Sequence, residues 1–167
     1  PRSGIDEVTG VFNQDQFYEN ASREFVRARS EDTSLSAIVF EIDGWERISS
    51  GTGGAEADDV LRAVVERATD ALRESDFVGR YGQATFAALL IDVDEEIAER
   101  VAERIRRAVD EEDFELADAT IPATVSVGAS TMTDAIRSID GLLDRADSAM
   151  LRASERGGDG VELAHLV

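Results

Sequence analysis

Apolar residues recur along this chain with two different periods, and the order of those periods predicts its helices and strands. Phe17, Ala21 and Phe25 share one face of a helix expected over residues 13–29, and the apolar run at 35–42 is typical of a buried strand. The same two patterns predict helices at 55–72, 94–109 and 139–153, and strands at 77–80, 86–91, 123–129 and 161–163.

The short strands at 77–80 and 86–91 are separated by Gly82-Gln83, which favours a tight hairpin. The glycine-containing segment after the first strand, 43–54, is expected to be a loop. The resulting order, βαββαβ with an extra helix and strand, predicts an α+β fold with a ferredoxin-like βαββαβ core and a mainly antiparallel sheet flanked by helices. This order serves many unrelated functions, so it does not by itself indicate one.

The length of 167 residues, with 43% of them hydrophobic and no low-complexity linker, predicts one globular domain. We expect residues 1–12 to be a lead-in and residues 13–167 to be globular. The abrupt start at Pro1 suggests a domain excised from a longer protein. No stretch reaches the roughly 18 apolar residues of a membrane span, and no secretion signal is present, so we predict a cytoplasmic protein without direct membrane insertion.

The formal charge of −19 limits the partners that this chain can bind. Such a field repels phosphate backbones, so nucleic acid binding is not expected, and any anionic ligand must be held by local arginines, the only basic residues present. The chain has no cysteine, and its one histidine is His165. Thiolate chemistry and histidine-rich metal centres are therefore excluded.

Six segments, spread in order over almost the whole chain, resemble the motifs of one family. They are residues 6–14 (DEVTGVFNQ), 41–50 (EIDGWERISS), 53–58 (GGAEAD), 80–86 (RYGQATF), 125–129 (VSVGA) and 146–159 (ADSAMLRASERGGD). On these residues the chain resembles the GGDEF domain, the diguanylate cyclase family that joins two GTP molecules into cyclic di-GMP. The resemblance implies the nucleotide-cyclase-like GGDEF fold and a place in a larger bacterial signalling protein.

The chain departs from the family pattern at positions that the resemblance implies to be catalytic. Glu41 stands at the first metal-binding acid, Ala84 at the second, and Thr85 at the acid that assists the attacking hydroxyl. Mg²⁺ requires hard oxygen ligands, and a methyl group offers none, so we predict no metal site, no cofactor and no cyclase activity. The altered signature consists of Gly82, Gln83, Ala84, Thr85 and Phe86.

Other positions of the implied substrate site also differ. Glu46 and Ser154 replace lysines that would neutralise phosphate, and Ser49 replaces an asparagine that would recognise guanine, whereas Asp58 is retained. An acid thus stands where a triphosphate would lie, without preorganised cations to stabilise the transferred phosphoryl group. We therefore interpret as a vestigial substrate site the residues Glu41, Ile42, Glu46, Ser49, Asp58 and Ser154.

The inhibitory product site of the family, an R-x-x-D motif joined by an arginine on the next helix, is matched by Arg73, Asp76 and Arg104. Guanidinium groups pair with guanine O6 and N7 or with phosphate, and a carboxylate accepts from guanine N1 and N2. The resemblance implies binding of cyclic di-GMP as a stacked dimer that bridges two copies, and hence a homodimer or contact with neighbouring domains. The simpler interpretation is a solvated ion pair.

These observations favour a cyclic di-GMP sensor or regulatory module without cyclase activity. Two alternatives remain at this point. One is a weakly active diguanylate cyclase that uses Mg²⁺ with Glu41, Asp43 and a borrowed ligand, and the other is a dimerisation or scaffold domain that binds no nucleotide.

Overall fold

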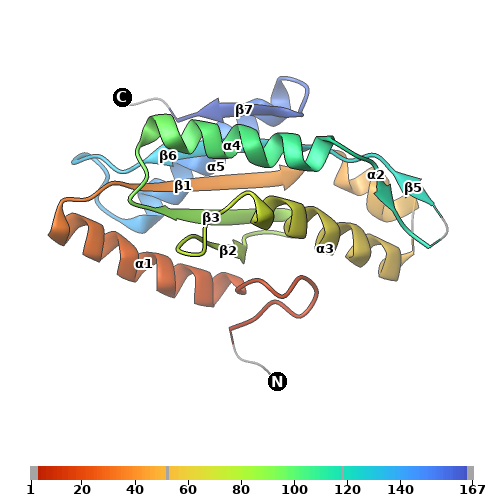
Figure 1. Ribbon diagram of the computed structural model, residues 1–167, viewed down its shortest axis with the longest axis horizontal. Coiled ribbons are helices and arrows are strands. Elements are labelled where there is room, and N and C mark those ends of the chain that lie inside the picture. Colours follow the sequence, from red (N-terminus) through yellow and green to blue (C-terminus); the bar gives the residue numbers. More distant parts are fainter. Residues whose placement is uncertain (1–3, 52, 118, 165–167) are drawn as a thin grey trace.

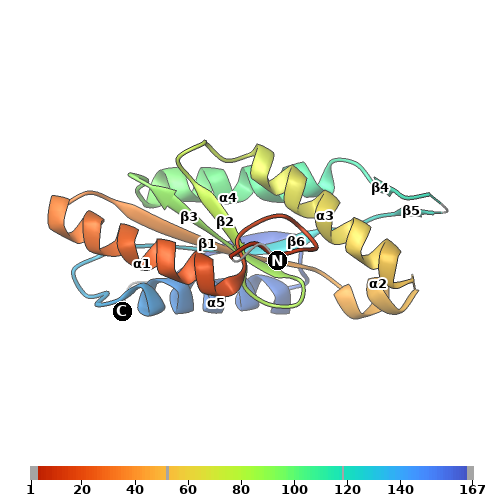
Figure 2. The ribbon, with the colours of Figure 1, turned by 90° about the horizontal axis from the view of Figure 1, so that it is seen from below.

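The computed structural model describes residues 4–51, 53–117 and 119–164, and it places a five-stranded sheet between two layers of helices (Figures 1 and 2). The strand order is β2-β3-β1-β6-β7, and every neighbouring pair is antiparallel except β6 and β7. This arrangement confirms the predicted ferredoxin-like fold and its mainly antiparallel sheet. The strands are β1 (Leu35–Ile42), β2 (Phe77–Arg80), β3 (Thr85–Ile91), β6 (Val125–Thr131) and β7 (Gly160–Leu163).

Two helices cover each face of the sheet (Figure 2). Helices α1 (Gln14–Glu31) and α5 (Ile139–Glu155) lie on one face, and α3 (Gly54–Asp70) and α4 (Glu95–Asp110) lie on the other. Alternate side chains of a strand point to opposite sides of the sheet, and helices cover both sides, so the central strand β1 is buried on both faces. Ala37 and Val39 pack with α1 and α5, while the interleaved Ile38, Phe40 and Ile42 pack with α3 and α4.

The helices begin where the sequence supplies a capping side chain. The side chains of Asn13, Asp94 and Ser138 accept hydrogen bonds from the first-turn amides of α1, α4 and α5. These caps explain why the predicted helix boundaries agree with the observed ones to within a few residues.

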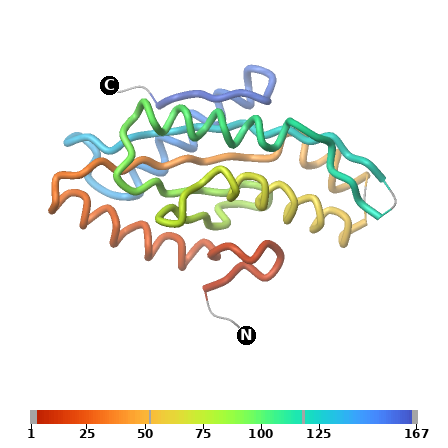
Figure 3. Tube along the Cα trace, viewed as in Figure 1, coloured from red at the N-terminus to blue at the C-terminus, as the bar shows by residue number. Residues whose placement is uncertain are grey.

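Two short elements correct the sequence interpretation. The segment expected to be a loop contains helix α2 (Trp45–Gly51), whose first turn forms on the carbonyl of Gly44. A second, two-stranded sheet, β4 (Phe114–Glu115) with β5 (Thr120–Ile121), extends beyond α4 at the end of the molecule where α2 lies (Figure 3). Both elements are too short to show a period. They are held by single buried side chains, Ile48 in α2 and Phe114 in β4.

The expected lead-in is folded onto the edge of the sheet over residues 4–12. Phe12 donates its amide to the carbonyl of Val78 at 3.2 Å and accepts from the amide of Arg80 at 2.8 Å. Phe12 also packs edge-to-face on Phe77. This segment therefore extends the edge beside β2. No helix among the described residues is both long enough and apolar enough to cross a membrane.

Gly128 gives a test of the packing between β6 and α5. A Cβ atom at this position would lie 2.1 Å from the carbonyl oxygen of Ala146 and 2.2 Å from the amide nitrogen of Met150. The atoms that this Cβ would meet belong to the backbone of α5 and cannot move aside as the end of a flexible side chain can. Gly128→Ala is therefore expected to lower the free energy of unfolding by about 3 kcal/mol. Urea denaturation followed by circular dichroism measures it. Gly51→Ala, whose Cβ meets nothing within 4 Å, is the control, and equal losses in the two variants would contradict this account.

Candidate functional site

The first predicted site residue, Glu41, lies at the end of β1 between two neighbouring strands. It faces Thr85 on β3 and Ser126 on β6 in the strand register. The Thr85 hydroxyl donates to Glu41 Oε2 at 2.9 Å. The carboxylate is therefore held by a side chain that replaces an acid of the family signature.

The signature turn is closed by its own backbone and by Arg80. The amides of Tyr81 and Gly82 donate to the carbonyl of Thr85 at 2.8 and 3.0 Å. The Arg80 guanidinium donates to the carbonyls of Gly82, at 3.0 Å, and Gln83. Arginine, with five donors in a fixed fork, suits this fastening of a tight turn.

Ala84 points into the protein instead of toward the strand end. It is 5% exposed and belongs to the core beneath α3 and α4, and its carbonyl accepts from the amide of Ile42 at 3.0 Å. A methyl side chain at this position supplies no oxygen ligand. Of the two positions that the resemblance implies to bind the metal, only Glu41 carries a carboxylate.

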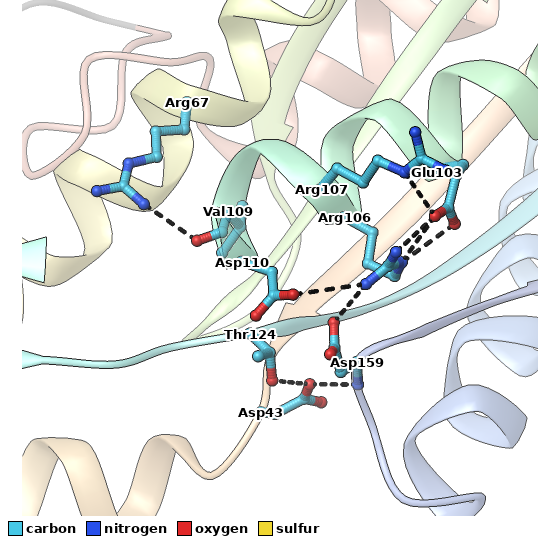
Figure 4. Close-up of polar contacts among 9 residues, drawn as sticks. All are labelled: Asp43, Arg67, Glu103, Arg106, Arg107, Val109, Asp110, Thr124 and Asp159. Carbon is cyan, nitrogen blue, oxygen red and sulfur yellow. Dashed lines mark hydrogen bonds and ion pairs between the residues drawn. The ribbon is translucent and has the colours of Figure 1, made fainter. Parts of the chain in front are cut away.

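The second carboxylate of this strand end, Asp43, accepts from three donors, of which Figure 4 shows Thr124 and Asp159. Its oxygens accept from the hydroxyl of Thr124 at 2.7 Å, the hydroxyl of Ser126 at 2.6 Å and the amide of Asp159 at 2.8 Å. Gly158 packs so closely that a Cβ there would lie 2.8 Å from Asp43 Cγ. Asp43 thus joins β1, the start of β6 and the last turn of the chain.

The same turn is tied to α4 by a network of ion pairs (Figure 4). Arg106 donates to Asp159 Oδ1 at 2.9 Å and forms a bidentate pair with Glu103. The hydrogen bonds that Arg106 donates to Glu103 and Asp159 raise the pKa of its guanidinium, so it stays charged. Sequence analysis missed the link between Arg106 and Asp159 because no local pattern indicates a contact between residues 53 positions apart.

The remaining positions of the expected substrate site are spread over three helices. Glu46 is exposed in the first turn of α2, and the Ser49 hydroxyl donates back to its carbonyl at 3.3 Å. Asp58 is half-buried near the start of α3, and Ser154 is half-buried at the end of α5. Ile42 is buried. His165 lies outside the described residues.

A link between the folded lead-in and the signature turn is a second feature that the sequence did not reveal. Asp6 accepts from Arg80 at 3.0 Å and from the amide and hydroxyl of Thr9 at 3.0 and 2.6 Å. Partial burial acts to raise the pKa of Asp6, but the hydrogen bonds from Thr9 and the charge of Arg80 outweigh it and hold the pKa below its usual value. The carboxylate is therefore ionised at neutral pH.

Arg73 and Asp76 form a closed turn between α3 and β2. The guanidinium of Arg73 donates to Asp76 Oδ1 at 3.0 Å and to the carbonyl of Ile91 at 2.5 Å. The side chain of Asp76 is only 2% exposed and also accepts the backbone amides of Arg73 and Ile91, at 3.2 and 3.1 Å. The side chain of Arg73 is 53% exposed. Asp76 thus holds an arginine that faces solvent.

The structure brings Arg104 to the same loop. Its Nε donates to the carbonyl of Ala71 at 3.1 Å, two residues before Arg73 in the chain. Arg104 is itself exposed. Two arginines from different elements therefore approach one loop.

Comparison with known proteins assigns the family. The family profile described as "Diguanylate cyclase, GGDEF domain" matches residues 3–160. The chain belongs to the GGDEF domain family.

Individual relatives agree with this assignment. Diguanylate cyclase DosC of Escherichia coli K12 is 32% identical over 161 residues, which cover 96% of this chain but 35% of that protein, so the chain spans about a third of the length of this relative. The GGDEF domain of PA1120 from Pseudomonas aeruginosa is 28% identical, with a TM-score of 0.91 over 97% of this chain and 95% of that one. The GGDEF domain of DgcB from Caulobacter crescentus, solved in complex with c-di-GMP, has a TM-score of 0.93 over 99% of this chain and 96% of that one; at 22% identity it supports the fold.

Removing the Asp43 carboxylate tests whether it fastens the strand end. Asp43→Ala leaves the hydroxyls of Thr124 and Ser126 and the amide of Asp159 without their acceptor, so the free energy of unfolding is expected to fall by about 1–3 kcal/mol. Asp59→Ala removes a carboxylate from an exposed pair with Arg62 and should cost less than about 1 kcal/mol. Thermal unfolding of both variants measures the difference. A loss at Asp43 no larger than that at Asp59 would refute the role.

Proposed function

We propose that this GGDEF domain is a cyclic di-GMP receptor that regulates a larger signalling protein and has no cyclase activity. The observation that carries the proposal is that Arg73 lies in the loop that follows α3 and that Arg104 donates to the carbonyl of Ala71 at the start of this loop. Both guanidinium groups donate to backbone carbonyls and remain exposed to solvent. In a domain of charge −19, such a pair of cations is a suitable place for a dianionic ligand.

The expected ligand contacts follow from the chemistry of the guanidinium group. Its planar fork matches the O6 and N7 edge of guanine and the oxygens of a phosphate. Arg73 and Arg104 supply these donors. Asp76 is already filled by the Arg73 side chain and two amides, so we assign it the role of holding Arg73 in the binding orientation.

The strand end supports the loss of catalysis in the same proposal. Phosphoryl transfer needs metal ions and cations arranged around the developing charge. Here Ala84 is packed in the core, Glu41 accepts from Thr85, and Asp43 accepts from three donors. A metal ion bound through Glu41, Asp43 and a borrowed ligand would compete with these hydrogen bonds for the carboxylates, and Glu46 would repel a bound triphosphate.

Cyclic di-GMP would also join two copies of the domain. A stacked dimer of the ligand offers guanine edges and phosphates on two sides, so Arg73 of one copy and Arg104 of another can bind one ligand cluster. The homodimer predicted from the sequence is, in this proposal, dependent on the ligand.

A product assay tests the absence of cyclase activity. Purified domain incubated with GTP and either Mg²⁺ or Mn²⁺ is expected to form no cyclic di-GMP above a blank without enzyme, because no ligand pair holds the metal beside the substrate. Liquid chromatography of the nucleotides, with an active cyclase assayed in parallel, gives the readout. Product that accumulates in proportion to the protein would establish the weak-cyclase alternative.

Calorimetric titration with cyclic di-GMP tests the receptor role. The wild-type domain should bind, and Arg73→Ala and Arg104→Ala should each weaken binding at least about tenfold, since a charge-assisted hydrogen bond contributes roughly 1.5–3 kcal/mol. Arg100→Ala is the matched control, because Arg100 is an exposed arginine one turn before Arg104 that pairs with Glu96.

Two results of this titration would count against the proposal. If the wild-type domain releases or absorbs no heat of binding, it does not bind cyclic di-GMP, and the alternative of a dimerisation or scaffold domain remains. Equal weakening by Arg100→Ala would show a general charge effect in place of a site.

A further inference from the structure

A second surface, on the opposite face of the sheet from Arg73 and Arg104, is a hollow between α1 and the start of α5. Nine residues line it, and most of the exposed lining is apolar. The large apolar side chains Tyr18 and Val26, which are 42% and 67% exposed, are two of the four exposed large hydrophobic residues of the described chain. The full lining consists of Tyr18, Ser22, Phe25, Val26, Arg29, Ser30, Arg137, Ser138 and Ile139.

The charge of this hollow differs from that of the rest of the domain. The nine lining residues include two arginines and no carboxylate. Four other hollows on the described surface each have at least one Asp or Glu in their lining. A positive, apolar groove in a chain of charge −19 favours an occupant that carries both apolar and acidic groups.

The two arginines are placed at the edge of the apolar floor. Arg29 lies over the ring of Phe25, with its guanidinium carbon 5.3 Å from the ring centroid, and donates to the carbonyl of Ile136. Arg137 is exposed. No ion pair joins either arginine to a carboxylate of the described residues. At the Tyr18 end, the nearby carboxylate of Asp140 already accepts from the Tyr18 hydroxyl at 3.0 Å.

The shape of the groove indicates a helical occupant. Tyr18, Ser22, Val26 and Ser30 follow one another at intervals of four residues, so they form a straight ridge along α1 of about 18 Å. The small serines alternate with the larger side chains and leave gaps between them. A second helix can place its own side chains into such gaps.

We propose that this groove docks an amphipathic helix of a partner protein, with carboxylates on that helix flanking its apolar row. The apolar row packs on Phe25, Val26 and Ile139, and the carboxylates pair with Arg29 and Arg137. A second copy of this chain is a poorer occupant, because two domains of charge −19 repel each other. The docking surface is separate from Arg73 and Arg104 and does not depend on nucleotide binding.

Fluorescence polarisation with two designed peptides tests the proposal. The probe is a labelled helical peptide of about 16 residues with leucine at helical i, i+3, i+4 spacing and glutamate beside each leucine, and its partner carries lysine in place of glutamate. Wild-type protein should bind the glutamate peptide at least tenfold more tightly than the lysine peptide. Val26→Glu and Arg137→Glu should each weaken that binding at least tenfold.

Matched controls separate the groove from the rest of the surface. Leu151→Glu changes an exposed apolar residue of α5 outside the groove, and Arg100→Glu changes an exposed arginine of α4. Neither should alter peptide binding, and all four variants should keep wild-type circular dichroism. Equal affinity for the two peptides, no binding of either, or equal loss in the controls would overturn the proposal. A dimer that Val26→Glu converts to monomer in light scattering would instead identify a second copy as the occupant, and would also overturn it.

Discussion

The carboxylate of Asp43 accepts from Thr124, Ser126 and the amide of Asp159, and it thereby fixes where β1, β6 and the last turn of the chain meet. The turn itself is unusual, since Gly157, Gly158 and Asp159 all have positive φ angles of 114°, 76° and 46°. Glycine adopts this conformation at low cost, and a side chain at position 158 would collide with Asp43. The geometry of the strand end follows from this contact.

The strand end and the loop after α3 differ in how their charged side chains are paired. At the strand end, Glu41 accepts from Thr85, Asp43 accepts from three donors, and Ala84 is buried. At the loop after α3, Arg73 and Arg104 are supported by backbone carbonyls and remain exposed. The proposed function assigns ligand recognition to the loop with exposed arginines and no catalysis to the strand end.

The fold could be predicted from the sequence because its long elements have strong periodic patterns, buried strands such as β1 and capped helices such as α4. Helix α2 and the β4–β5 hairpin could not, because each depends on a single buried side chain that has no period. Of the candidate site residues, Arg73, Asp76 and Arg104 were predicted from motif position, but the enclosure of Asp76 could not be foreseen. The contacts Asp6–Arg80 and Arg106–Asp159 join residues 74 and 53 positions apart, and no local pattern reports such distances.

The central claim is that the domain recognises cyclic di-GMP through Arg73 and Arg104 at the loop after α3 and has no nucleotide site at the strand end. Mapping of ligand contacts by nuclear magnetic resonance tests this claim. Cyclic di-GMP is added with Mg²⁺ to isotope-labelled domain, and the shifts of the amide resonances are followed. We predict saturable shifts around Arg73, Asp76 and Arg104, with residues 41–43 and 84–85 unchanged. Saturable shifts at residues 41–43 and 84–85, without shifts around Arg73 and Arg104, would contradict the claim.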